Sequence, residues 1–519
     1  MNQNEILKFC LEKGLLVDSE VLNLFNDVGD LDSVKLIMEK VRSDTNQNVI
    51  TKNILEKNKE KMGRFIVGLP EEKQKVLEKF KVKLGLSIEI SAEVSSEIEN
   101  EKNVLTESVV KISPETKLEN KKIEVKDFVR YFRNRFEEMR NILQEHSELE
   151  NLISINKLSG NSQGVSIIGI VSDKQITKNK NMILEVEDLT GKVKVLINNN
   201  RKELFEKAED IALDSVLGFK GSGNSEIFFA NDFVFPEAML PEKKRGLAEE
   251  KVLFMGDLHF GSKRFLKKSF ESFIEWLNNS EEAKKVKYLF LVGDIVTGVG
   301  NYPNQGVDLE IGDLEEQFVA LAKILDSIRK DVKIIISPGN HDGVRIMEPQ
   351  PVFDEKYAWA LHDLKNVILT ENPAYVNIAS GEGFSGFDIL TYHGFSYSYY
   401  AGNIPSLIKK KAMNSPEEIM KFLLKNRHLA PTHASTQYFP LEHDPLIIKK
   451  IPDFFISAHT HKCAVNSYNN VLIVSTSCWE AMTPYQEKFG NEPDHCKVPM
   501  VNLKTREVKI LDFEEDEDG

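Results

Sequence analysis

The sequence predicts a multidomain α+β protein, in which a helical N-terminal domain and a small β-barrel precede a larger α/β domain. Three observations support this prediction. The chain has 519 residues, more than one ordinary domain holds. Apolar side chains recur at helical spacing near the N-terminus, and short β runs separated by turns follow residue 160. Beyond residue 248, apolar runs repeatedly end just before Asp, Asn or His.

Composition limits the functional class. Hydrophobic residues make up 41% of the chain, enough for sizeable cores, and the formal net charge is -14. This charge argues against nonspecific binding of nucleic acid by the whole surface, so a polyanionic substrate would need metal ions or a basic partner. The sequence shows no membrane-spanning apolar run, no signal peptide and no C-x-x-C pair among its four cysteines. We expect a soluble, cytoplasmic protein with reduced thiols.

Residues 1–62 are predicted to form a helical interaction domain. Asp18 and Ser19 are suitable N-caps for the second of its three apolar runs. Residues 63–122 are rich in Lys, Glu, Ser and Asn and poor in aromatic residues. Such a segment buries too little apolar area to offset the entropy of ordering it, so we expect a flexible charged linker with solvated charges.

An amphipathic helical segment is predicted over residues 123–160. Phe128, Phe132 and Phe136 recur there at helical spacing between charged residues. The segment also carries four arginines, Arg130, Arg133, Arg135 and Arg140. These side chains could contact phosphate, but a solvated helix face is the favoured interpretation.

Five short β segments lie within residues 161–240, separated by Gly, Asn and Asp turns. They are Val165–Val171, Met182–Glu187, Val193–Ile197, Ser215–Lys220 and Glu226–Val234. Five strands in this span fit a small barrel of the OB type. OB barrels can bind single strands by aromatic stacking, but no pattern of exposed aromatic residues is evident here. A structural or subunit-docking role is therefore somewhat favoured.

The predicted α/β domain covers residues 248–513, and an acidic tail, 514–519, follows it. Its first apolar run, Val252–Met255, suits a buried strand, and Asp257 and His259 come directly after it. Alone, the Asp-x-His motif is a weak signal, since a surface turn with a solvated aspartate is the simpler interpretation. The hypothesis of a functional site therefore depends on partners elsewhere in the chain.

Four further apolar runs end in the same way. They are Val286–Val292, Val332–Ile336, Phe387–Thr391 and Phe454–Ser457. The metal-capable residues at the five strand ends are Asp257, His259, Asp294, Asn340, His341, His393, His459 and His461. Because sites in α/β proteins form at the carboxyl ends of strands, we expect these side chains to converge. Singly, each motif has a simpler explanation as a turn or a hydrogen-bonded core histidine, whereas their combination indicates a site.

These residue types favour a particular class of metal. Carboxylate, imidazole and one amide oxygen suit borderline-hard divalent ions such as Mn²⁺, Fe²⁺ or Zn²⁺, and the lack of thiolate argues against a structural zinc site. Two such ions need a bridging anion that holds them roughly 3.5–4 Å apart. Asp294, at the end of a central strand, could supply this bridge.

In this order, the motifs resemble those of the calcineurin-like metallophosphoesterases. That pattern runs D-x-H, GD, GNH(D/E), H and GH-x-H, and the chain supplies each part except the last glycine, which is Ala458 here. The resemblance implies a two-sheet sandwich flanked by helices and two divalent ions, with Mn²⁺ favoured over Fe²⁺, Zn²⁺ or Mg²⁺.

The same resemblance implies a role for each residue. One ion would be held by Asp257, His259, Asp294 and His461. The other would be held by Asp294, Asn340, His393 and His459. His341 would stay unliganded and face the substrate as a general acid or transition-state stabiliser, with Asp342 orienting it.

The order of domains is similar to that of the small subunits of archaeal family-D DNA polymerases. Residues 302–305 and 427–431 look like inserts of that family, and the resemblance covers residues 126–513 well and the first 125 in outline. It implies a 3'-to-5' proofreading exonuclease acting on single-stranded or mismatched DNA 3' ends. It also implies a heterodimer with a large polymerising subunit, while the N-terminal domain could bind a sliding clamp or other replisome proteins.

Three residues near the predicted site are candidate substrate contacts. Tyr397 and Tyr399 could stack on terminal bases, or they could pack in a lid or core. Arg345 could contact a phosphate, or it could form a salt bridge.

Two other functions compete with the nuclease. One is a catalytically silent scaffold for the polymerising subunit, which the complete ligand set disfavours. The other is a free-standing phosphoesterase for small nucleotides or phosphoproteins, which has no evident use for the upstream domains.

Overall fold

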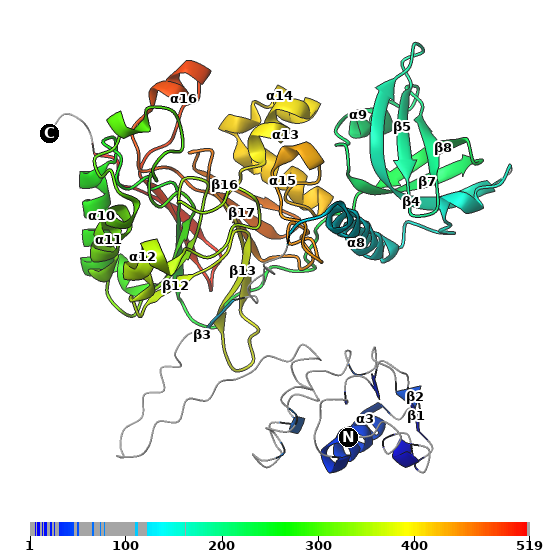
Figure 1. Cartoon of the computed structure of the whole chain (residues 1–519), viewed down its shortest axis with the longest axis horizontal. Coiled ribbons are helices and arrows are strands. Elements are labelled where there is room, and N and C mark those ends of the chain that lie inside the picture. The colour runs from blue at the N-terminus through cyan, green and yellow to red at the C-terminus, as the bar shows by residue number, and fades with distance from the viewer. Residues whose placement is uncertain are drawn as a thin grey trace. The chain divides into compact units, whose positions relative to one another are not determined.

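The computed structural model describes most of the chain after residue 121 and parts of what precedes it. The described residues are 109–112, 122–160 and 162–515, with 31–45, 49–50 and short pieces between 6 and 77. Contacts divide the chain into two compact units, Met1–Val104 and Leu105–Gly519 (Figure 1). Among the described residues, no helix is long and apolar enough to cross a membrane.

The first unit contains helix α3 (Leu31–Thr45) and two short parallel strands, β1 (Leu16–Val17) and β2 (Val49–Ile50). The helix contributes its apolar side chains to one core. The buried members of this core are Ile6, Cys10, Leu15, Val21, Phe25, Val34, Ile37, Met38, Val41, Leu55, Ile66 and Leu77. Because Ile66 and Leu77 are buried here, the helical domain extends past the predicted boundary at residue 62.

Strand β3 (Val109–Ile112) lies within the segment that was predicted to be a linker. It pairs antiparallel with β13 (Ala374–Ser380) at the edge of a sheet in the second unit. The linker prediction is therefore wrong for these four residues, because a β-branched run too short to identify alone gains its hydrogen bonds from a distant edge strand. The other residues between 78 and 121, and the acidic tail after 515, lie outside the described part.

Helix α8 (Val125–Gln144) opens the continuous part of the second unit, and five strands after it close into a barrel. The strands are β4 (Ser162–Ile176), β5 (Met182–Glu187), β6 (Lys192–Ile197), β7 (Val216–Gly223) and β8 (Ile227–Val234), in the order β4-β5-β6-β8-β7. Alternate side chains such as Val193, Val195 and Ile197 fill its interior. The five predicted strands are present, while the assignment to the OB type stays a prediction.

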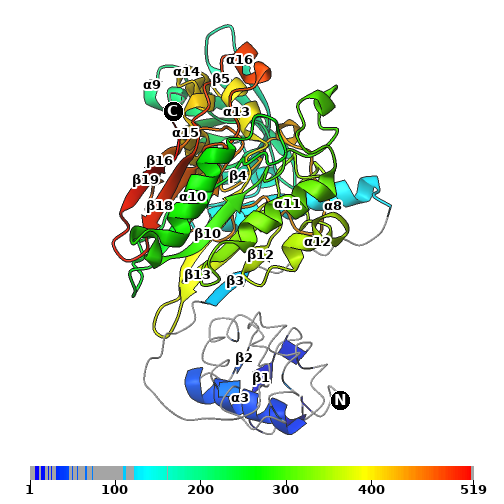
Figure 2. The same cartoon turned by 90° about the vertical axis from the view of Figure 1, so that its left-hand side faces the viewer.

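The rest of the second unit is a sandwich of two six-stranded sheets flanked by helices (Figures 1 and 2). The first sheet runs β12 (Val367–Leu369), β11 (Lys333–Ser337), β10 (Val286–Val292), β9 (Lys251–Met255), β18 (Lys497–Asn502), β19 (Val508–Asp512). The second runs β16 (Ala464–Tyr468), β17 (Val471–Ser475), β15 (Phe454–Ser457), β14 (Phe387–Tyr392), β13, β3. This arrangement confirms the predicted two-sheet sandwich.

Helices cover the outer face of each sheet. The helices beside the first sheet are α10 (Lys267–Asn279), α11 (Leu314–Asp326) and α12 (Glu355–His362), and those beside the second are α13 (Tyr397–Asn403), α14 (Pro405–Lys409) and α15 (Pro416–Asn426). The shorter elements are α9 (Lys202–Glu209), α16 (Pro484–Phe489), η1 (Ile155–Lys157), η2 (Glu282–Lys285), η3 (Gln305–Val307), η4 (Ala412–Asn414) and η5 (His433–Ser435).

Strand β9 shows why the central strands read as uninterrupted apolar runs. Val252 and Phe254 belong to the core between the two sheets, whereas Leu253 and Met255 belong to the core under helices α10 and α11. A strand buried on both faces needs apolar side chains at every position. This is the pattern from which the strands carrying the candidate ligands were predicted.

A buried ion pair joins helix α8 to the loop between η5 and β15. Arg135 Nε donates to Asp444 Oδ2 at 2.5 Å, and both side chains are almost fully buried. Arg135 also donates to the Pro431 carbonyl and to the Tyr131 hydroxyl, and His428 Nε2 lies 2.9 Å from the same Asp444 oxygen. Of the four helix arginines proposed as possible phosphate contacts, Arg135 is therefore excluded, because its guanidinium is occupied inside the protein.

We predict that Arg135→Ala lowers the free energy of unfolding by about 3 kcal/mol, because it leaves the Asp444 carboxylate buried with only the His428 ring and the Leu446 backbone N–H as partners. Arg133→Ala is the matched control, since Arg133 is exposed on the same helix and its loss should cost less than about 0.5 kcal/mol. Urea unfolding of the full chain measures both values. Equal losses would contradict the assignment of Arg135 as the structural arginine.

Candidate metal centre

The carboxyl ends of parallel strands from both sheets meet at one edge of the sandwich. Asp257 and His259 follow β9, and Asp294 follows its parallel neighbour β10. Backbone hydrogen bonds hold these loops in register, since Asp257 N–H donates to the Gly293 carbonyl at 3.0 Å and His259 N–H donates to the Asp294 carbonyl at 2.9 Å. In the second sheet, His393 follows β14, and His459 and His461 follow the parallel strand β15.

A backbone hydrogen bond is among the contacts that connect the site residues of the two sheets directly. Asp257 Oδ2, from the first sheet, accepts from the backbone N–H of His459, from the second, at 2.8 Å. Asn340 and His341 follow β11, and the His341 backbone N–H donates to Asp294 Oδ1 at 2.7 Å. All eight metal-capable residues predicted from the sequence are thereby brought to one place.

Five of these residues adopt a backbone conformation that non-glycine residues rarely adopt. Asp257, His259 and Asp294 each have φ of 48°, His461 has 57° and His459 has 70°. Left-handed conformations cost free energy and persist where the surrounding structure imposes them, most often at functional sites. Their concentration at these strand ends indicates that the backbone is bent to aim the side chains.

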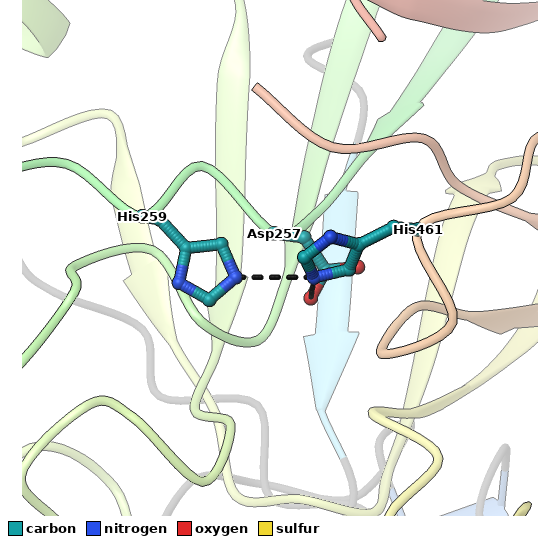
Figure 3. A group of neighbouring side chains, drawn as sticks. All are labelled: Asp257, His259 and His461. Atoms are coloured by element: carbon teal, nitrogen blue, oxygen red, sulfur yellow. Dashed lines mark hydrogen bonds and ion pairs between the residues drawn. The ribbon is translucent and has the colours of Figure 1, made fainter. Parts of the chain in front are cut away.

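The first cluster consists of Asp257, His259 and His461, whose candidate ligand atoms all lie within 4.8 Å of one another. Figure 3 shows the three side chains pointing toward one another, with His259 Nε2 3.2 Å from His461 Nε2. Asp257 Oδ1 is buried, has no hydrogen-bond partner in the described structure and lies 3.8 Å from His461 Nε2. A buried carboxylate oxygen without a donor, facing two ring nitrogens, fits a divalent cation.

The second cluster consists of Asp294, His393 and His459. His393 Nε2 lies 3.2 Å from Asp294 Oδ2, 3.1 Å from Asn340 Oδ1 and 3.3 Å from His459 Nδ1. Gly339 makes room for this arrangement, since a Cβ at that position would lie 2.3 Å from Asp294 Oδ1. Asp294 also groups with His259 and His341, so it stands between the two clusters.

Burial and mutual repulsion set the protonation states of these groups. Burial raises the pKa of the Asp257 carboxyl well above its usual value, and the nearby Asp294 adds to this effect. Burial lowers the pKa of His461 well below its usual value and that of His459 to about 3. Burial would also lower the pKa of His393, but the adjacent Asp294 carboxylate raises it to about 9. Neutral imidazoles and an ionised Asp294 are the forms that bind metals.

The donor set therefore fits two divalent cations. It consists of carboxylates, imidazoles and one amide oxygen, and the clusters contain no cysteine. Asp294 is the only residue placed to serve both clusters among the described candidates.

Asp342 does not orient the His341 ring as predicted. Its Oδ1 accepts from the Val296 N–H at 2.9 Å and its Oδ2 from the Gly339 N–H at 2.7 Å, so both oxygens bind backbone. Burial and the Asp294 charge raise the pKa of this carboxyl to about 7. Asp342 instead fixes the two loops that carry Asp294 and His341.

His341 is oriented by the loop after β10. Its Nδ1 lies 3.2 Å from the Thr297 carbonyl oxygen and 3.2 Å from Asn301 Nδ2. The ring of His341 packs edge to face against that of His259, with centroids 4.9 Å apart. Sequence reasoning missed Asn301, because nothing in its local sequence shows that it reaches a histidine forty positions away.

The structure also places the candidate substrate contacts. Tyr397 is fully buried in the core beneath α13, so the proposal that it stacks on bases is wrong. Tyr399 is partly buried and packs edge to face against Tyr400. Phe395 is the aromatic residue at the site, since its ring lies 5.8 Å from that of His459. It belongs to the aromatic segment that drew attention to the tyrosines, but its spacing alone did not distinguish it.

Arg345 is committed to local structure. Its guanidinium donates to the Met347 carbonyl at 3.2 Å and to the Pro349 carbonyl, and it lies over the Phe439 ring. These contacts replace both the phosphate contact and the salt bridge that the sequence left open.

Gln486 is a further neighbour of the site that sequence reasoning missed. Its Nε2 lies 2.8 Å from His461 Nδ1, while its Oε1 accepts from the Thr483 N–H in the capping box of α16. The spacing of Thr483 and Gln486 is typical of a helix start, but it does not reveal that the helix reaches a ligand.

Comparison with known proteins gives consistent matches. The calcineurin-like phosphoesterase family model matches residues 250–463. The DNA polymerase II small subunit of Methanothermobacter thermautotrophicus is 35% identical over 398 residues, which cover 75% of this chain and 80% of that protein. That of Archaeoglobus fulgidus is 36% identical and covers 71% and 73% of the two chains. That of Pyrococcus furiosus is 37% identical, and the match spans 75% of this chain but only 64% of that longer relative.

We predict that Mn²⁺ raises the melting temperature of the full chain by several degrees, because a ligand at one hundred times its Kd stabilises the folded state by about 2.7 kcal/mol. Asp257→Asn should lose most of this increment. Without metal, the same variant should melt above the wild type, because it removes a buried carboxyl that the Asp294 charge repels.

Thermal denaturation with and without EDTA measures these shifts. Asp326→Asn is the control, since Asp326 is exposed on α11 and its loss should leave the metal increment unchanged. An undiminished metal increment in Asp257→Asn would exclude Asp257 as a ligand.

Proposed function

The chain belongs to the family of DNA polymerase II small subunits, and we propose that it is a metal-dependent 3'-to-5' exonuclease working with a large polymerising subunit. The observation that carries the proposal is the position of Asp294 between two largely buried ligand clusters from four strand ends, with Asn340 and His341 of a fifth strand end beside them. A silent scaffold has no need for such clusters, which leave Asp257 Oδ1 without a hydrogen-bond donor among the residues that the structure describes.

The two clusters support an assignment of each proposed ligand to one of two cations. Asp257, His259, Asp294 and His461 would hold one, and Asp294, Asn340, His393 and His459 would hold the other. Two divalent ions at such a site lower the pKa of water and neutralise the charge that develops on a phosphoryl group. Mn²⁺ suits these ligands, and Fe²⁺, Zn²⁺ and Mg²⁺ are the alternatives.

Like Asn340 and His459, His341 is partly exposed, so its side chain can reach a bound substrate. If Nδ1–H donates to the Thr297 carbonyl, the Nε2 atom is left free to face a bound phosphodiester. When both ring nitrogens are protonated, Nε2–H can donate its proton to the departing 3' oxygen of the shortened strand, while the released nucleotide keeps the 5' phosphate. Asn301, which contacts both the ring and the backbone of His341, holds it in this position.

The proposed partners follow from the family and from the charge of the chain. A large polymerising subunit would supply much of the affinity for DNA, since the chain carries a net charge of -14. The preferred substrate is a single-stranded or mismatched 3' end, and a sliding clamp is a candidate partner for the N-terminal unit.

We predict that the wild-type chain shortens a 5'-labelled primer with a 3' mismatch in the presence of Mn²⁺. His341→Ala should reduce this rate by about 10²–10⁴-fold, because the variant lacks the proton donor. Its metal-dependent rise in melting temperature should persist. Gel analysis of the shortened primers measures the rate.

His443→Ala is the control, because His443 is exposed and pairs with Glu138 away from the site. If His341→Ala loses metal stabilisation together with activity, His341 is a ligand. If the wild type cuts nothing even with the large subunit added, the chain is an assembly subunit that keeps its ligands without using them.

A further inference from the structure

A hollow of about 560 Å³ opens between α13, the η4 turn and the residues after α16. We propose that it binds a segment of the DNA strand next to the scissile phosphate; this inference rests on the proposed nuclease function. Its lining includes Ser398, Ala401, Gly402, Lys411, Asn414 and Asn491. The volume lies within the usual range of ligand sites.

Both walls of the hollow are connected to candidate metal ligands. On one side, α13 begins just after Phe395, whose ring lies 5.8 Å from that of His459. On the other side, Asn491 N–H donates to the carbonyl of Gln486, whose side chain contacts His461. Helices α13, α14 and α16 stand at the same end of the domain in two perpendicular views (Figures 1 and 2). The proposed strand would pass from the metal centre along these connections into the hollow.

The polar lining suits a nucleotide chain. Lys411 is exposed, and its ammonium has no ion-pair or hydrogen-bond partner among the described residues, whereas its neighbour Lys410 pairs with Glu418 at 2.5 Å. The side-chain amides of Asn414 and Asn491 likewise make no hydrogen bond within the described part of the chain. A cation and two amides are the groups with which proteins bind phosphate and sugar oxygens.

Gly402 points to the same use of this surface. It lies in α13 with no left-handed φ, and a Cβ at this position would meet nothing within 4 Å. Glycine in a helix is less stable than alanine, so neither backbone conformation nor packing explains it. Lys411 adds strain, since its φ is 50°. Residues that lower stability without improving packing or backbone conformation are expected at functional sites.

The test compares two substrates with the full chain. Hydrolysis of bis(p-nitrophenyl) phosphate reports the metal centre alone, whereas the KM for a single-stranded oligonucleotide also reports the strand site. We expect Lys411→Glu and Gly402→Phe to raise the oligonucleotide KM about tenfold and to leave hydrolysis of the small diester unchanged. Lys411→Glu should also reduce the salt dependence of this KM, which a purely structural role would not do.

Lys409→Glu is the matched control, because Lys409 is exposed two positions away and lies outside the lining. It should change the KM less than Lys411→Glu does, since Lys409 does not line the hollow. Gly402→Phe is expected to fold normally, because its side chain enters open space.

An unchanged oligonucleotide KM in both variants, with an active wild type, would overturn the inference and leave the proposed function intact. The strand assignment is also overturned if the variants keep the wild-type oligonucleotide KM and lose only their inhibition by thymidine monophosphate. The hollow would then hold the released nucleotide. If the wild type cleaves neither substrate, the nuclease proposal fails separately. In that case the Kd for a fluorescent oligonucleotide tests the hollow as a strand site. An unchanged Kd in both variants overturns the inference.

Discussion

The buried carboxylate of Asp294 is the constraint on which the rest of the site depends. It sits at the end of the central strand β10, accepts from the His341 backbone N–H at 2.7 Å and lies 3.2 Å from His393 Nε2. Burial opposes its ionisation, yet the His393 and His341 rings keep its pKa well below the usual value. A buried anion next to a second buried carboxyl is costly unless cations lie beside it. The loops, left-handed residues and glycines around it all serve to place ligands about this one charge.

The sandwich stabilises a site that is itself strained. Strands β9 and β10 are buried on both faces, and their cores lie directly beneath the loops that carry Asp257, His259 and Asp294. The left-handed conformations of these residues are imposed by backbone hydrogen bonds between neighbouring loops. Helix α8 also separates structural side chains from exposed ones. The buried pair of Arg135 and Asp444 holds this helix in place, whereas the exposed arginines of the helix do not.

The sequence was sufficient to predict features that depend on residues close together in the chain. Strands with both faces buried give uninterrupted apolar runs, and the residues that follow them supplied every candidate ligand. It was insufficient where a role depends on distant contacts. Asp342 binds the Val296 and Gly339 amides rather than His341, and Tyr397 is buried beneath its own helix. Strand β3 and Gln486 act through partners far along the chain, which no local pattern reveals.

The most direct test of this account is the number of metal ions that one chain binds. After loading with Mn²⁺ and removal of free metal, elemental analysis of the wild-type chain should give two ions per chain. Asp294→Ala should lose both, because each cluster would be left without its shared carboxylate. A wild-type chain that holds at most one ion, or an Asp294→Ala variant that keeps two, would contradict the claim that Asp294 joins two metal sites.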